Sequence, residues 1–406
     1  MTKIILYIVF CVCFICFFLL LQYKNKYNNW AIIAGVIFFL LKAFLILLNE
    51  ELVFFEPKLA GDYALELYKI YNNGNKPEFE GIHFMYENFQ LQTWINYIPF
   101  TIFGANRHVL LITNAFLTSL CPIFVYFVLS NYKNHRSGFW TYIYFNILPS
   151  VINFSIFGLR DPLVFFFVTI NIISLYVLYQ RFSFSYLCFV ILSLVAIIDL
   201  RNEMLAFICL PYLWLFKNKI FKLYEKLKGF GTKFSFWFIV IIFFTIPGLL
   251  VISYLYQKVI SNLGVIQFVS PAEIASTYAE MRYSRFEDEG GGSNILPPNL
   301  YYALPWSLRW LLQSLGIIIL PFPWLIYSIA KLLAFIDSCF FLYFIFNFLK
   351  GYKNQGTFIR ILFFTFIFGV LIMGIIVSNA GNAFRMRISI APYILFMAGL
   401  QLKKNE

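Results

Sequence analysis

Apolar stretches of nearly 20 residues recur along the 406-residue chain, separated by shorter polar segments. A helix of about 20 apolar residues crosses the hydrocarbon core of a bilayer. The pattern predicts about eleven membrane-spanning helices, at residues 3–22, 30–49, 108–130, 138–158, 162–180, 184–200, 203–216, 234–256, 327–349, 361–378 and 388–402. We therefore expect an all-α fold, a polytopic bundle that forms a single transmembrane domain over residues 1–406.

Two segments between the expected spans, 50–107 and 257–326, are much longer than the others. Loops of this length are usually functional, and the aromatic residues of 88–104 predict a helix lying in the membrane interface. In the second segment, Pro321 and Pro323 interrupt an apolar stretch, and proline breaks a helix interior. We expect 311–326 to be interfacial or re-entrant and 327–349 to be the spanning helix.

The composition supports a membrane protein, since 61% of the residues are hydrophobic and 12% are charged. An ordinary soluble domain has about 25% charged residues. The net charge of +12 is explained by topology, because the short segments on one side hold 16 basic residues and two acidic ones. The positive-inside rule then places the N-terminus outside, the C-terminus in the cytoplasm and both long segments outside. The basic net charge therefore gives no support for a nucleic-acid partner.

Several other classes of site have no support in the sequence. All seven cysteines fall inside expected spans, where they are typical small apolar residues. The chain has no HExxH, paired CxxC, GxGxxG or P-loop motif, so a structural zinc site and a nucleotide-binding fold have no support, and we assign no residue as a metal ligand. The first span runs into Lys24 and Lys26, which indicates a retained helix and not a removed signal peptide.

Acids and arginines gather at the outer ends of the expected spans, and 16 of the 19 acids fall outside. The candidates occupy five separate connections: Asp62 and Glu66, Arg160 and Asp161, Arg201 and Glu203 (beside Asp199), Arg282 and Arg285, and Arg385 and Arg387. Arginine grips phosphate with a planar fork of donors. We predict that these arginines bind the phosphate or pyrophosphate of a lipid carrier. Pairs such as Arg160–Asp161 could instead be ion pairs that anchor helix ends.

A carboxylate beside such arginines can act as a general base. Transfer of a glycan from a phosphate carrier to a hydroxyl group requires removal of the hydroxyl proton and positive charge at the leaving phosphate. We predict Asp62 as the base, with Glu66 one helical turn away and Asp161 as a further candidate. His83, in the first outer segment, is an alternative base.

Four short motifs carry a resemblance to a known family: Gly61-Asp62-Tyr63 followed by Tyr68, Arg160-Asp161-Pro162-Leu163, Arg201-Asn202-Glu203, and Arg385-Met386-Arg387 followed by Pro392. With these motifs the chain resembles the integral-membrane glycosyltransferases of the GT-C superfamily. In layout it looks most like the Wzy-type polymerases that join repeat units of O-antigen and capsule.

The resemblance implies an outward-facing site in the bacterial inner membrane, with polyprenyl-linked glycans as donor and acceptor. A divalent cation and a chain-length regulator are further expectations of this kind, and no nucleic acid is expected. The first outer segment has a single acid, Asp62, where many sugar-transferring members have an acidic pair. No large soluble domain follows the last expected span. Both departures favour a repeat-unit polymerase.

Two alternatives remain open at this point. One is a related enzyme that transfers a single sugar from a polyprenyl-phosphate donor. The other is a flippase or transporter for lipid-linked glycans, which would place polar residues near the membrane midplane. Its candidates are Lys42, Lys331 and Asp337, which lie within expected spans.

Overall fold

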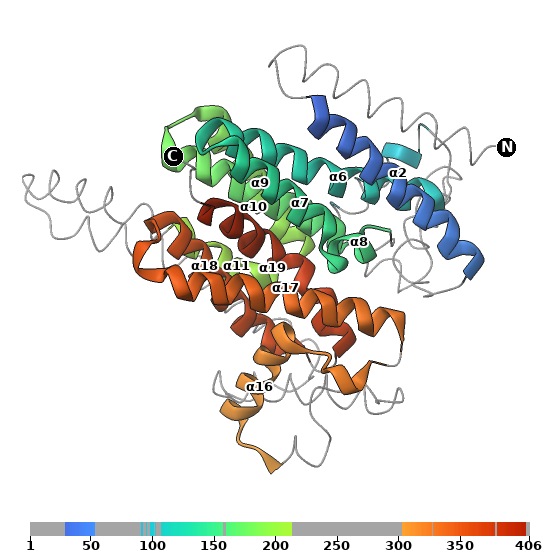
Figure 1. Ribbon diagram of the computed structural model, residues 1–406, viewed down its shortest axis with the longest axis vertical. Coiled ribbons are helices and arrows are strands. Elements are labelled where there is room, and N and C mark those ends of the chain that lie inside the picture. Colours follow the sequence, from blue (N-terminus) through green and yellow to red (C-terminus); the bar gives the residue numbers. More distant parts are fainter. Residues whose placement is uncertain are drawn as a thin grey trace, which may run out of the picture. The chain divides into compact units, whose positions relative to one another are not determined.

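The computed structural model describes residues 29–52, 107–156, 160–212, 303–326, 328–377 and 380–402, with a few more positions between 91 and 102. Every regular element in these ranges is a helix (Figure 1). Five helices are long and apolar enough to cross a membrane: Val109–Tyr132, Asp161–Gln180, Lys331–Asn354, Thr357–Ile375 and Gly381–Gln401. The helical membrane character is therefore shown, whereas the expected eleven spans are not confirmed. Spans 3–22 and 234–256 lie outside the described residues.

The chain divides into two compact units. The first comprises Met1–Leu200 and Ala391–Glu406, and the second comprises Arg201–Ile390. The boundary falls within the last helix, α19 (Ala380–Gln401), so this helix contributes residues to both units.

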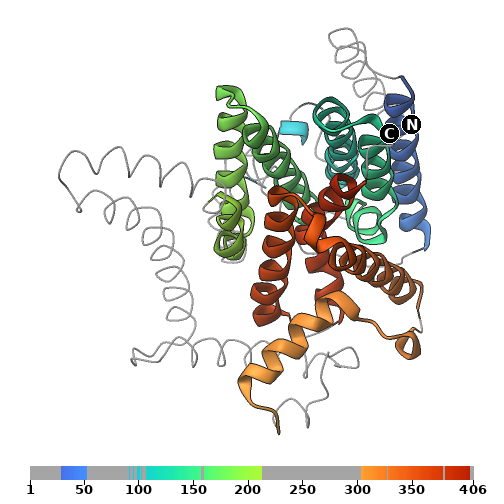
Figure 2. The ribbon, with the colours of Figure 1, turned by 60° about the vertical axis from the view of Figure 1, so that its left-hand side comes forward.

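In the first unit, α6 is the central helix. The unit contains α2 (Asn29–Leu52), α6 (Arg107–Tyr132), α7 (His135–Ile147), α8 (Pro149–Ser155), α9 (Asp161–Gln180) and α10 (Phe184–Leu200). Helix α6 packs against α2, α7 and α9, and α10 packs against α9 (Figure 2). A helix apolar on all sides can be buried in this way by several neighbours.

The expected span at 138–158 is two helices, so the prediction of one continuous helix was wrong. Helix α7 ends at Ile147, the backbone of the next residue, Leu148, is extended (φ −64°, ψ 120°), and Pro149 is the first residue of α8. Proline disfavours the helical conformation in the residue before it and lacks the N–H group that would continue the helix. The sequence carried this signal at Pro149.

A fully buried lysine joins α2 to α6. The Nζ atom of Lys42 donates hydrogen bonds to the hydroxyl oxygens of Thr118 (3.1 Å) and Ser119 (3.2 Å), and 2% of the lysine is exposed. Both hydroxyl groups donate their own protons to backbone carbonyls one turn earlier on α6. Their lone pairs are therefore free to accept from the ammonium group, which satisfies part of its hydrogen-bonding need inside apolar surroundings.

The second unit is built on α16 (Trp306–Ile319), α17 (Ile329–Gly351) and α18 (Thr357–Ile376). Helix α16 packs against both α17 and α18, and the short segments η1 (Asn202–Met204) and α11 (Leu205–Ile208) also pack against α18. The expected span at 203–216 therefore does not begin as one regular helix, since two short helical pieces precede Cys209.

Two prolines separate α16 from α17. Helix α16 ends at Leu320, a short turn follows at Pro323–Leu325, and α17 begins after Ser328. The Ser328 hydroxyl accepts a hydrogen bond from the Lys331 backbone N–H at 3.3 Å and caps the new helix. The break lies where Pro321 and Pro323 predict it, while an interfacial or re-entrant position for 311–326 stays a prediction.

The close packing of α16 on α18 depends on a glycine. A methyl group added at Gly374 would lie 2.8 Å from the Cα atom of Ser314, which is backbone and cannot rotate away, whereas one added at Gly356 would have nothing within 4 Å. We expect Gly374→Ala to destabilise the protein by about 1–3 kcal/mol through overpacking and Gly356→Ala to change stability by less than about 0.5 kcal/mol. Thermal unfolding in detergent measures both variants, and equal midpoints would contradict this packing.

Candidate functional site

Four of the ten predicted site residues lie outside the described residues: Asp62, Glu66, Arg282 and Arg285. Their proposed roles therefore stay predictions from sequence. The other six lie at the start of α9 (Arg160 and Asp161), around η1 (Arg201 and Glu203) and on α19 (Arg385 and Arg387).

In the first unit, the start of α9 adjoins the end of α10. Arg160 immediately precedes α9, and its Nη1 atom donates a hydrogen bond of 2.9 Å to the carbonyl oxygen of Leu200, the last residue of α10. The two helices form a hairpin, so the beginning of one and the end of the other meet at the same end. The predicted connection at Arg160 and Asp161 thus lies beside Leu200, the last residue of this part of the first unit.

The two carboxylates of this region lie at helix ends. Asp161 is completely buried in the first turn of α9, where the partial positive charge of the helix N-terminus stabilises a negative group. Asp199, near the end of α10, accepts a hydrogen bond of 2.9 Å from the backbone N–H of Leu91. These positions favour helix anchoring for Asp161, because a base must reach a substrate hydroxyl and this side chain is not exposed.

In the second unit, Arg201 lies between a carboxylate and a sulfur atom. Its guanidinium group is 3.8 Å from the Glu203 carboxylate and donates to the sulfur of Met386 on α19. Arg201 is 1% exposed, while the Glu203 side chain is 18% exposed. The connection after α10 and the arginine-bearing part of α19 therefore meet within this unit.

Helix α19 begins at Ala380, eight residues before the expected start of the last span. Arg385 and Arg387 consequently lie on a helix and not in a connection, which corrects the sequence interpretation. Residues two apart on a helix face different directions. Arg385 is half-buried and Arg387 is completely buried, so the two arginines cannot share one role.

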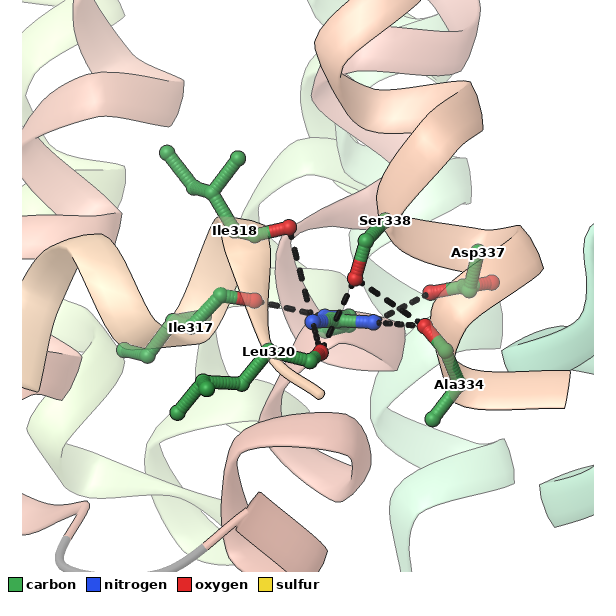
Figure 3. Close-up of polar contacts among 7 residues, drawn as sticks. Ile317, Ile318, Leu320, Ala334, Asp337 and Ser338 are labelled. Carbon is green, nitrogen blue, oxygen red and sulfur yellow. Dashed lines mark hydrogen bonds and ion pairs between the residues drawn. The ribbon is translucent and has the colours of Figure 1, made fainter. Parts of the chain in front are cut away.

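The guanidinium group of Arg387 is surrounded by acceptors (Figure 3). Three of them are carbonyl oxygens at the end of α16: Ile317, which accepts from Nε at 2.5 Å, Ile318, which accepts from Nη2 at 3.5 Å, and Leu320, which also accepts from Nη2. The last carbonyl groups of a helix have no partner within that helix. A buried helix end needs donors from elsewhere, and Arg387 supplies them.

The prolines explain why α16 needs this arginine. In a continuous helix the carbonyl of Ile317 would accept from the N–H of residue 321, but Pro321 has none. Arg387 Nε replaces the missing donor at that carbonyl. Its positive charge also lies at the negative end of the α16 dipole, which is a stabilising arrangement.

Helix α17 completes the cluster from the other side. Arg387 Nη1 donates to the carbonyl oxygen of Ala334 at 2.7 Å and lies 3.5 Å from the carboxylate of Asp337. Both charged side chains are fully buried. Each neutralises the charge of the other, which would be costly to bury alone. The Ser338 hydroxyl is within hydrogen-bonding distance of the carbonyls of Leu320 (2.9 Å) and Ala334 (3.0 Å). We call Arg387, Asp337 and Ser338 with these carbonyls the Arg387 cluster.

Arg387 is therefore a structural residue in this conformation. A guanidinium group has five N–H donors, and four carbonyls and one carboxylate surround it. These contacts are all to the protein itself and favour a structural role, and phosphate binding by Arg387 stays a prediction from sequence. The sequence interpretation noted Asp337 as a charge within an expected span but did not pair it with Arg387. A charge at membrane depth usually has a partner, and that was the available signal.

Within the described ranges, no three His, Cys, Asp or Glu side chains gather where they could hold a metal ion. A divalent cation thus remains an expectation from the family resemblance. Comparisons with protein-family models, with curated proteins and with solved structures found no match.

The Arg387 cluster predicts a large stability effect. Arg387→Ala leaves several buried carbonyls and the Asp337 carboxylate without a donor, and we expect a loss of about 3–5 kcal/mol, the usual cost of breaking a buried ion pair. The control is Arg360→Ala, since Arg360 stacks on Tyr352 at a helix end and donates one hydrogen bond to Lys353; we expect a loss of at most about 1 kcal/mol. Thermal unfolding in detergent compares them, and similar midpoints would show that the cluster does not support the fold.

Proposed function

We propose that the chain is a membrane glycosyltransferase that moves a glycan from a polyprenyl-(pyro)phosphate carrier onto a lipid-linked glycan acceptor, polymerising repeat units of a surface polysaccharide. The observation that supports this most is the pairing of Arg201 with Glu203 beside Met386. Arg385 immediately precedes Met386 on α19, so two arginines and a partly exposed carboxylate come from segments nearly 200 residues apart in the chain.

In this proposal the arginines and the carboxylates have separate roles. Arg385, which is half-buried, stabilises negative charge on the leaving carrier phosphate. Arg201 is 1% exposed and adds positive charge from within the protein, where Glu203 holds its guanidinium group in place. Asp62 accepts the proton of the acceptor hydroxyl. The acceptor oxygen forms the new glycosidic bond as the bond between the sugar and the carrier phosphate breaks. Arg160 is a positioning residue, because it binds the carbonyl of Leu200 immediately before Arg201.

The transport alternative has less support than it had from sequence. Asp337 was one of its three polar candidates within the expected spans, and the ion pair with Arg387 neutralises that charge. The single-sugar alternative uses the same chemistry and is separated from polymerisation by the length of the product.

Asp62→Asn and Arg385→Ala should each abolish long-chain polysaccharide while the protein still inserts and folds. The first removes the proposed base and the second removes charge at the leaving phosphate, so each should lower transfer by at least about 100-fold. The matched control is Asp199→Asn, because an asparagine oxygen can still accept the hydrogen bond from Leu91. Glycan ladders on gels and the amount of protein in purified membranes are the two measurements. Wild-type ladders from either variant would refute the role of that residue.

A deletion strain distinguishes the three candidate functions. Polymerisation predicts that single lipid-linked repeat units accumulate on the outer leaflet and that long chains disappear. A single-sugar transferase predicts loss of one sugar from otherwise complete chains, and a flippase predicts accumulation on the inner leaflet. Mass spectrometry of extracted glycolipids, combined with labelling by a membrane-impermeant reagent, separates these outcomes.

A further inference from the structure

At one end of the first unit, the turn between α6 and α7 lies beside the turn between α9 and α10. Helices α6 and α9 end there, and α7 and α10 begin there. The guanidinium carbon of Arg181, just after α9, lies 5.4 Å from the ring centroid of Tyr132 at the end of α6. The Tyr132 ring also meets the ring of Tyr176 edge-on at 6.4 Å. These contacts hold the turn after α9 beside the turn after α6.

Every formally charged residue in the two turns, within segments 128–140 and 176–188, is basic. Lys133, Arg136 and Arg181 are exposed on the two turns and the first residues of α7. The segments 128–140 and 176–188 contain no aspartate or glutamate, so nothing within them offsets these charges. We call Lys133, Arg136 and Arg181 the basic end.

Two exposed phenylalanines border the basic end. Phe182 and Phe184 follow Arg181 directly and are 73% and 72% exposed. Aromatic rings beside lysine and arginine at the ends of apolar helices are typical of a membrane interface. There the rings contact the upper acyl chains while the cations reach the phosphate level. A free phosphate ion would use the charges but would gain nothing from the rings.

We propose that the basic end binds the headgroup of an anionic phospholipid. Lys133, Arg136 and Arg181 hold its phosphate, and Phe182 and Phe184 lie against its acyl chains. The cation–π contact with Tyr132 keeps the Arg181 guanidinium at this place before the lipid arrives. By the positive-inside prediction, this lipid belongs to the cytoplasmic leaflet. The proposal is independent of glycosyl transfer, because it uses none of the residues assigned to that reaction.

The test is lipid binding to the purified full-length protein in neutral detergent, measured by native mass spectrometry. The probes are phosphatidylglycerol, phosphatidylcholine and water-soluble glycerol phosphate. We expect the wild type to retain phosphatidylglycerol selectively. Each basic residue near anionic lipid contributes about fivefold in affinity. The combined change Lys133→Gln, Arg136→Gln and Arg181→Gln should therefore weaken phosphatidylglycerol binding about 100-fold and leave phosphatidylcholine unchanged.

The matched control removes three positive charges from the second unit: Lys350→Gln, Lys353→Gln and Arg360→Gln. If this control loses phosphatidylglycerol to the same extent, the binding reflects net charge alone and the proposed site is wrong. The charge-neutral change Phe182→Ser with Phe184→Ser should weaken phosphatidylglycerol binding and leave unfolding temperature unchanged, since both rings are exposed. Binding of glycerol phosphate as strong as that of the lipid would also overturn the proposal, because it would identify a site for free phosphate.

Discussion

A helix that ends inside an apolar bundle needs hydrogen-bond donors for its last carbonyl groups, and in the second unit Arg387 provides them. Pro321 ends α16 and removes the donor that would have served Ile317. One guanidinium group then binds the end of α16 and the side of α17 from its position on α19. A single planar cation thus links three helices of this part of the protein.

This constraint separates the arginines of the candidate site into two kinds. Arg387 is fully buried and donates to carbonyls, while Arg385, two residues earlier, is half-buried and is the arginine that the proposed function assigns to the carrier phosphate. Arg160 resembles Arg387 in that it binds a backbone carbonyl at a helix end. Both residues show that arginine at the end of an apolar helix can satisfy backbone groups as readily as it can bind a ligand.

Sequence reasoning identified the helical membrane character and placed α9, α17 and the break before α17 close to their observed positions, because apolar length and proline are local signals. It predicted one continuous helix at 138–158, because the apolar content of the segment was given more weight than the helix-breaking signal of Pro149. It also missed the buried contacts of Arg387, because the partners of this residue are carbonyls 53 to 70 positions away in the chain. Backbone acceptors have no side-chain signature, so no pattern of residue types marks them.

The buried ammonium group of Lys42 has a consequence for how the protein is made. Residues 30–49 are predicted to span the membrane, and a lysine at the centre of a spanning helix raises the cost of its entry into lipid by about 3 kcal/mol on translocon-based scales. The hydroxyls that accept its hydrogen bonds belong to Thr118 and Ser119, which are synthesised more than 70 residues later. The hydrogen bonds of Lys42 can therefore form only after α6 has been synthesised. Insertion of α2 is then completed together with that of α6 and not before it.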